Sequence, residues 1–182
     1  MRKALILILL AALLMVFGGC TISHEFGPYS GKVVDAQTGE PIEGAVVLIG
    51  FYTKSFSVGG PVYRFADAFE TLSDAKGEFR FPPNRITSFK VMRIWDKNSR
   101  ITIFKPGYGA YPGHYKTFSA PKLTPSRFLP EDEHITFHLP KLLTLEERKE
   151  NLYKIQKPAG ISNDRIPILR KLEDQEYLNV GL

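Results

Sequence analysis

The segment from Asp132 to Leu139 carries the residues best suited to metal chemistry. It alternates polar and apolar side chains, as a half-buried strand does, and this places Asp132, His134 and His138 on one face. On a strand the Cβ atoms of the two histidines would lie about 13 Å apart, which is too far for both to bind one Zn²⁺ ion. We therefore expect a solvated strand face here and no metal site. A metal-dependent hydrolase built on these three residues is the weakest functional hypothesis.

Cys20 is the only cysteine of the chain, so no intramolecular disulfide is possible. It follows a short positive region, Arg2-Lys3, an apolar run over residues 4–17 and two small residues, Gly18-Gly19. An apolar run of this length is typical of a signal peptide and is short for a membrane span. A lone cysteine is usually a small buried apolar residue, but this one directly ends the apolar run.

Small residues directly before a lone cysteine resemble the bacterial lipoprotein signal. The resemblance implies that residues 1–19 are a signal peptide, that Cys20 is acylated with palmitate or a similar chain, and that residues 20–29 form a lipidated tether. Phe17 stands where leucine is usual, and an uncleaved N-terminal anchor is the alternative. Thr21 is not the aspartate that retains lipoproteins in the inner membrane of enteric bacteria. The resemblance therefore favours the outer membrane, facing the periplasm or the cell surface.

Aromatic and imidazole rings recur in residues 105–130, where prolines preclude much regular structure. Rings exposed on a loop can stack on sugars or fill a partner's pocket. The same rings can instead pack onto the fold, because a long ordered loop needs a small cluster of its own. We favour the packing interpretation and keep the binding interpretation as a hypothesis. The candidate binding residues are Tyr108, Tyr111, His114, Tyr115 and Phe118.

The chain contains no recognisable catalytic motif. No Ser, Cys or Thr nucleophile stands in a known sequence context, and there is no phosphate-binding loop or close set of His and carboxylate ligands. We therefore expect a protein that is not an enzyme and has no cofactor.

Two turn motifs predict a small β-sandwich. Val33-Val34 runs into Asp35–Gly39, in which the aspartate can accept backbone N–H groups and the glycine supplies positive φ. Ser73–Gly77 has the form of a hairpin loop, and the residues after it alternate, which points Phe79 and Phe81 inward.

Residues 28–139 resemble the carboxypeptidase regulatory-like domain, a transthyretin-like antiparallel β-sandwich. The resemblance implies a sandwich over residues 30–140 and a non-catalytic module of an exported protein, with no catalytic residues. It is carried by Val34-Asp35-x-x-Thr38-Gly39-x-Pro41-Ile42-x-Gly44-Ala45, Thr71-x-x-Asp74-x-x-Gly77-x-Phe79, Lys105-Pro106-Gly107-Tyr108 and Ile135-Thr-Phe137-His-Leu139.

Residues 141–182 are predicted to form two helices. The first opens at a capping box, Thr144-Leu-Glu-Glu147, and the second runs from about Asp164 to Leu178 with Pro167 in its first turn. The stretch Val46–Phe51 is apolar on both faces, so we expect the helices or the long loop to cover its outer face. The alternative is that the last helix docks on another protein.

Residues 51–70 interrupt the sandwich motif with a glycine- and serine-containing segment rich in aromatic residues. We expect an extended hairpin whose rings cover the sandwich edge, with a recognition loop as the alternative.

The charge of the chain argues against nucleic acid as a partner. The formal net charge is +5 and falls to +3 when Arg2 and Lys3 leave with the signal peptide, and positive residues form no long block.

Together these features predict a non-catalytic envelope lipoprotein, attached to the membrane by its lipid, that acts as an accessory or scaffold for another envelope protein. A carbohydrate-binding module for cell-wall or surface glycan is the alternative.

Overall fold

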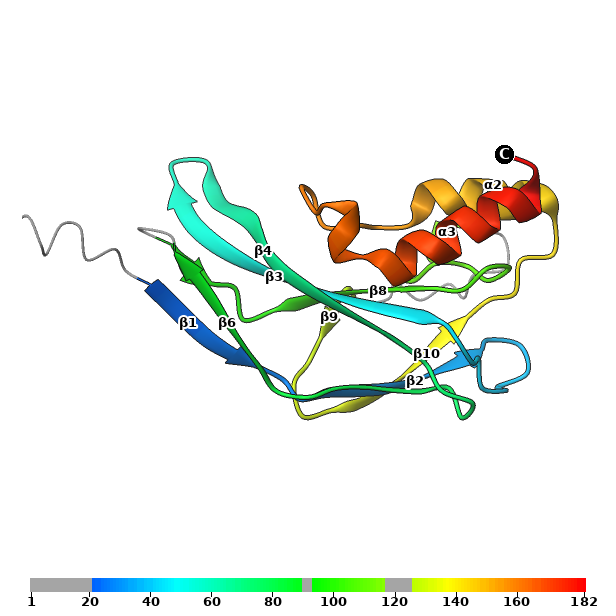
Figure 1. The fold of residues 1–182 in the computed structure, drawn as a ribbon, viewed down its shortest axis with the longest axis horizontal. Helices are drawn as coiled ribbons and strands as arrows, with labels where there is room; N and C mark the ends of the chain where they lie inside the picture. The colour runs from blue at the N-terminus through cyan, green and yellow to red at the C-terminus, as the bar shows by residue number, and fades with distance from the viewer. Residues whose placement is uncertain (1–20, 90–92, 117–125) are drawn as a thin grey trace, which may run out of the picture.

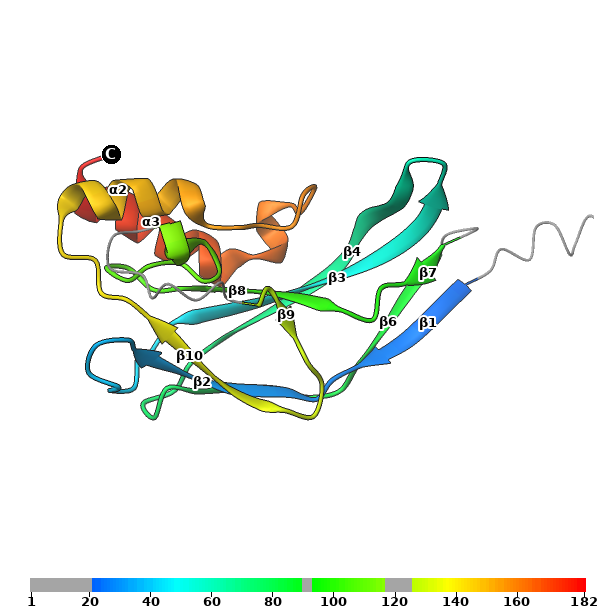
Figure 2. The same cartoon turned by 180° about the vertical axis from the view of Figure 1, so that it is seen from behind.

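The chain forms three layers in the computed structural model, which describes residues 21–89, 93–116 and 126–182 (Figure 1). A small sheet lies at the bottom of this view, a larger sheet in the middle and two helices at the top. Figure 2 shows the same order of layers from behind. The expected mainly β fold, an antiparallel β-sandwich with a two-helix C-terminal extension, is confirmed.

In the small sheet, β2 (Tyr29–Asp35) lies between β5 (Glu78–Phe81) and β10 (His134–Leu139). β5 is antiparallel to β2, whereas β10 is parallel to it. The inward residues alternate along each strand, and the core between the two sheets includes Val33 and Phe137. This sheet therefore covers one face of its larger neighbour.

The two turn motifs have the predicted chemistry. The Asp35 side chain accepts the backbone N–H of Gln37 at 2.8 Å, and the Asp74 carbonyl accepts the N–H of Gly77 at 2.8 Å. Gly77 has a φ of 75°, and a Cβ there would stand 2.4 Å from the carbonyl oxygen of Val33. Only glycine fits this turn, because both the backbone angle and the close approach exclude a side chain.

The large sheet has a long hairpin at one edge. The hairpin projects beyond the rest of the sheet (Figure 1), as expected for an extended hairpin over residues 51–70. The strands of this sheet, in spatial order, are β4 (Gly60–Leu72), β3 (Val46–Ser57), β8 (Ser99–Phe104) and β9 (Phe128–Leu129), with β7 (Ile94–Trp95) paired to the far part of β3.

The predicted tether over residues 20–29 is wrong from Thr21 onward. Residues Thr21–Phe26 form β1, which pairs in antiparallel register with β6 (Asn84–Phe89). Phe26 and Tyr29 are both buried in the core between the sheets. Burial of two large aromatic side chains fixes this segment to the fold, so it is a strand and not a spacer.

The C-terminal extension follows the predicted pattern closely. α2 (Leu145–Lys154) begins at Thr144, whose side chain accepts the N–H of Glu147 in a complete capping box. A short 3₁₀ turn, η2 (Asn163–Arg165), precedes α3 (Pro167–Val180), which carries its proline at the first position and ends at Gly181 in the left-handed conformation.

The helices cover the outer face of β3, as expected from its two apolar faces. Val46 and Leu48 belong to a second core that includes Leu152 of α2 and Leu169 of α3. Val47 and Ile49 alternate with them and face the small sheet. The extension is therefore part of the fold and does not leave its apolar face free for another protein.

Polar contacts fix the direction in which α3 lies on the sheet. The Glu70 carboxylate on β4 accepts the backbone N–H groups of Ile168 and of Leu169, the latter at 3.0 Å. A carboxylate at this end is favourable because the first N–H groups of a helix lack partners within the helix.

None of the helices in residues 21–89, 93–116 and 126–182 has the length and apolar character needed to span a membrane.

Replacing Leu169 by alanine tests the contribution of the helix–sheet core. Leu169 is fully buried, and removal of a buried leucine side chain leaves a cavity, so we expect the free energy of unfolding to fall by about 3 kcal/mol. Leu178→Ala on the same helix is the control, because Leu178 is 79% exposed and its loss should change stability by less than about 0.5 kcal/mol. Chemical denaturation measures both. Equal effects of the two substitutions would contradict a helix packed as described.

A candidate anion-binding cleft

Three of the five candidate binding residues of the long loop have described side chains, and these face the fold. Tyr111 and His114 are buried, and Tyr108 is partly buried against the core between the sheets. The ring of Tyr111 packs edge-on against that of Phe137, with ring centres 5.0 Å apart. The binding hypothesis for Tyr111 and His114 is therefore wrong, because side chains buried in this way cannot contact a partner. The side chain of Tyr115 and all of Phe118 lie outside the described residues.

The helices hold the first part of this loop in place. Asn151 of α2 is buried and bridges two loop positions: its side chain accepts the N–H of Ala110 at 2.7 Å and donates to the carbonyl of Tyr108 at 3.0 Å. The fully buried carboxylate of Glu176 accepts the N–H of Gly107 at 3.2 Å. These contacts explain why rings in a proline-rich segment pack inward.

The histidines of β10 lie on the solvent side of the small sheet, as their spacing predicted. His134 and His138 are both exposed, and His134 Nε2 lies 3.3 Å from a carboxylate oxygen of Glu78. Across the described residues no three His, Cys, Asp or Glu side chains are grouped in a way that could hold a metal ion. Cys20, the predicted lipidation site, lies outside the described residues.

A cleft opens where the outer face of the large sheet meets the linker between α2 and η2. Its inner part has a volume of about 70 Å³ and its outer part about 500 Å³, and Tyr52, Arg100 and Lys157 line both. We call it the Arg100 cleft and define it by Tyr52, Tyr63, Arg64, Arg100, Arg127 and Lys157.

Sheet register places the strand residues of the cleft on one face. Leu48 pairs with Thr102 and Gly50 with Arg100, so these four residues share the outer face, on which Tyr52 follows Gly50 two positions later. The helices cover this face at Leu48, whereas Tyr52 farther along it is buried beneath the guanidinium group of Arg100.

The floor and one wall of the cleft depend on a close approach between sheet and linker. A Cβ at Gly50 would meet the ring of Pro158 at 3.0 Å, so a larger residue there would push the linker away. Thr102 donates its hydroxyl to the carbonyl of Gln156 at 2.6 Å. Lys157 therefore stands beside the sheet, where its ammonium group also pairs with Glu173 at 3.0 Å.

Arg100 is held over two tyrosine rings. Its guanidinium carbon lies 4.1 Å from the centre of the Tyr52 ring and 5.2 Å from that of Tyr63, within the range of cation–π attraction. Burial raises the pKa of Tyr52, and the nearby charge of Arg100 opposes that rise. The rings fix the guanidinium plane without neutralising its charge.

The cleft gathers positive charge and contains no acidic lining residue. Among the described residues, Arg64, Arg100 and Arg127 have no carboxylate within ion-pair distance, and the buried Nε of Arg100 has no hydrogen-bond partner. Converging like charges repel one another, and a bound anion would remove that repulsion. The arrangement is suited to holding a carboxylate or phosphate group.

Comparisons with known proteins add a likeness of fold only. No family model matches the chain, and no curated protein matches it. Among solved structures, the chain is similar to the C-terminal domain of the shaft pilin SpaA from Lactobacillus rhamnosus GG, with 17% sequence identity and a TM-score of 0.33, over 66% of this chain and 98% of that domain.

Burial of His114 predicts a pH-dependent stability. Desolvation lowers the pKa of this imidazole in the folded chain, while the unfolded chain takes up the proton near pH 6.5. The unfolded state then binds more protons below that pH, so acidification should destabilise the fold by at most about 1.4 kcal/mol per pH unit for one group. We expect the free energy of unfolding to fall less steeply below pH 6.5 in His114→Phe than in the native chain.

His138→Phe, which removes an exposed histidine of β10, is the control for this comparison. Indistinguishable pH profiles for the native chain and His114→Phe would show that the buried imidazole does not resist protonation.

Proposed function

We propose that the protein is a non-catalytic lipoprotein of the bacterial cell envelope that binds a partner through the Arg100 cleft. The apolar run over residues 4–17, followed by Gly18-Gly19 and Cys20, supports the membrane attachment. The resemblance of residues 28–139 to carboxypeptidase regulatory-like modules, which are usually non-catalytic, supports a role in binding.

The binding proposal rests on the orientation of Arg100 and on its lack of a carboxylate partner among the described residues. A guanidinium group oriented by Tyr52 and Tyr63, with a buried Nε and no carboxylate partner among the described residues, is pre-organised for an incoming anion. Arginine is favoured for such contacts because its planar fork matches a carboxylate or phosphate with two hydrogen bonds. Pre-organisation also reduces the entropy lost on binding.

An acidic segment of an envelope protein fits the dimensions of the cleft. The inner part, of about 70 Å³, is large enough for a single small anionic group, whereas the outer part, of about 500 Å³, leaves room for the chain that carries it. Arg64 and Lys157 at the outer part would attract such a segment from solution.

An acidic glycan is the second candidate, and Tyr63 favours it. Tyr63 is 42% exposed beside Arg64 and Arg100, and exposed aromatic rings stack on the flat faces of sugars. The two candidates share the anionic group and differ in the polymer that carries it.

Photocrosslinking in intact cells tests the binding proposal. With a photoreactive residue at Ala159, which lines the outer part of the cleft, we expect a discrete adduct with an envelope protein. The yield of the adduct should fall about tenfold or more in Arg100→Gln, because a charge-assisted hydrogen bond contributes at least about 1.5 kcal/mol to the binding free energy. If glycan-degrading enzymes instead remove the added mass of the adduct, the result would favour the glycan.

Two matched variants control this experiment. Tyr153 is exposed on α2 and outside the cleft, so a photoreactive residue there should give no such adduct. Arg85→Gln removes an exposed positive charge from β6 and should leave the Ala159 adduct unchanged. Equal adducts at positions 153 and 159, or insensitivity to Arg100→Gln, would contradict binding in the cleft.

Metabolic labelling tests the membrane attachment. Cells given an alkyne analogue of palmitate should incorporate label into the native chain and none into Cys20→Ser, because Cys20 provides the only thiol of the sequence. An unlabelled native chain that still fractionates with membranes would favour the uncleaved N-terminal anchor.

A further inference from the structure

The start of the described chain constrains how a lipid-anchored form would meet the bilayer. Thr21 follows Cys20 directly and already pairs with Phe89 as the first residue of β1. No spacer therefore separates Cys20 from the folded body. An acyl chain on Cys20 would hold the end of the molecule that contains the start of β1 against the membrane surface.

The tip of the β3–β4 hairpin lies at the same end of the molecule. Figures 1 and 2 show the start of β1 and the hairpin tip together at one end of the long axis, with the C-terminus toward the other. The strand pairing supports the same placement. Thr21 pairs with Phe89, and Ile94, only five positions after Phe89, pairs with Lys54 in the hairpin.

The hairpin tip is apolar and exposed. Phe56 is 76% exposed and Val58 is fully exposed, and Pro61 lies directly opposite Phe56. Val62 follows in β4, and Ile94 of the adjoining β7 is 52% exposed. Apolar side chains gathered at one projecting tip mark a contact surface, whereas isolated ones would not.

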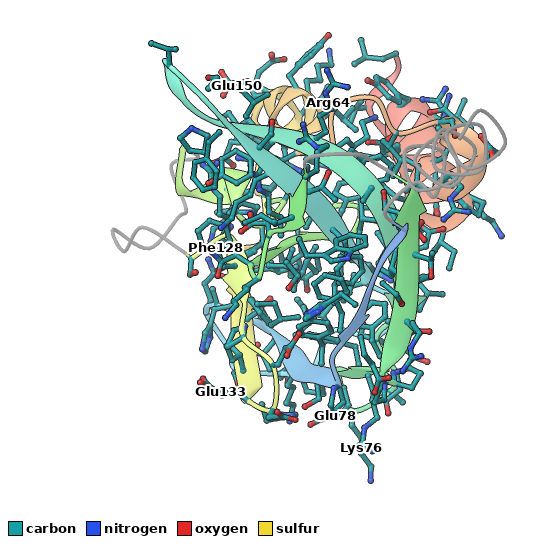
Figure 3. The ribbon with its side chains drawn as sticks, turned by 90° about the vertical axis from the view of Figure 1, so that its left-hand side faces the viewer. Arg64, Lys76, Glu78, Phe128, Glu133 and Glu150 are labelled. Carbon is teal, nitrogen blue, oxygen red and sulfur yellow. The ribbon has the colours of Figure 1, made fainter. Side chains whose placement is uncertain are left out.

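Amphipathic and positive residues follow the apolar tip toward the body. Tyr63 pairs with Lys54, and Arg64 comes next in β4. Figure 3 looks onto this end and places Arg64 at the hairpin side of the molecule, at the opposite edge from Lys76 and Glu78. An apolar tip with tyrosine and positive residues behind it matches the hydrocarbon boundary and headgroup region of a bilayer.

Arg93 stiffens the hairpin by binding both of its strands. Its guanidinium donates to the hydroxyls of Thr53 and Ser55, each at 2.9 Å, and to the carbonyl of Val62 at 2.9 Å. These bonds join the two strands next to the tip and favour its extended form. A rigid projection can enter an interface without an additional ordering cost.

We propose that the tip of this hairpin, formed by Phe56, Val58, Pro61 and Val62, inserts into the interfacial region of the bilayer that carries the lipid anchor. This second contact rests on the proposed lipidation of Cys20. It fixes the orientation of the body and places Tyr63 and Arg64, at the outer part of the Arg100 cleft, beside the headgroups.

Fluorescence quenching of the full chain in vesicles tests the proposal. The variant Val58→Cys, purified from bacterial membranes, is labelled with an environment-sensitive fluorophore and reconstituted into vesicles of phosphatidylethanolamine and phosphatidylglycerol that contain a shallow spin-labelled lipid. We expect quenching at least about twofold stronger than for a label at Leu178→Cys, near the C-terminus. Adding Phe56→Ser should reduce the quenching at position 58, whereas Leu178→Ser should not.

Mass spectrometry of the same preparation separates the two proposals. An acylated chain whose label at position 58 is no more quenched than that at 178 overturns the hairpin contact and leaves the anchor intact. A quenched label at position 58 in Cys20→Ser supports the hairpin contact independently of acylation. If the chain is not acylated and neither label is quenched in the Cys20→Ser background, where only the introduced thiol is labelled, both proposals are overturned.

Discussion

The two apolar faces of β3 are the constraint on which the rest of the structure depends. Val47 and Ile49 complete the core of the sandwich, and Val46 and Leu48 point the other way. Each exposed side chain of this kind would forgo roughly 1.5–3 kcal/mol of stabilisation from burial. The sandwich alone would therefore present an apolar stripe to water, and the helices of residues 145–180 remove it. The C-terminal extension is consequently a third layer of the fold and not an appendage to it.

The hydrophobic effect is not directional, so polar contacts must determine how the helical layer is oriented on the sheet. Glu176 is fully buried and receives two hydrogen bonds from Arg148, at 2.8 Å and 2.6 Å, which raise the pKa of the guanidinium further above its ordinary value. Glu70 holds the first turn of α3, and Asp67 pairs with Arg165. Misplacing a helix would leave a buried carboxylate without its partner, which costs more than the intact pair contributes. These carboxylates therefore specify one arrangement of the helices.

Local chemistry was predictable from the sequence, whereas contacts between distant segments were predictable only where β3 was apolar on both faces and needed a cover. The turns at Asp35 and Asp74, the capping box at Thr144 and the proline at the start of α3 depend on residues within a few positions of one another. β1 pairs with a strand about sixty positions later, and its own short sequence carries little strand pattern. The Arg100 cleft draws on β3, β4, β8 and the linker after α2, so no motif could reveal it. One signal was present: Tyr52 continues the outward alternation of Val46 and Leu48, beyond the part of the face that a short tail could cover.

A ligand in the proposed Arg100 cleft would couple the large sheet to the helical layer. Arg100 belongs to the sheet, whereas Lys157 belongs to the linker that the helices hold in place, and Glu173 of α3 is the only carboxylate paired with a positive residue of the cleft among the described residues. An anion bound between Arg100 and Lys157 would contact both layers and would bind only when they are docked. By mass action, a ligand with this preference stabilises the docked arrangement by an amount that rises with the logarithm of the ratio of its concentration to its dissociation constant. A loosened helical layer should in turn weaken binding, because Lys157 would leave the sheet and the positive charges of the cleft would no longer converge on one point.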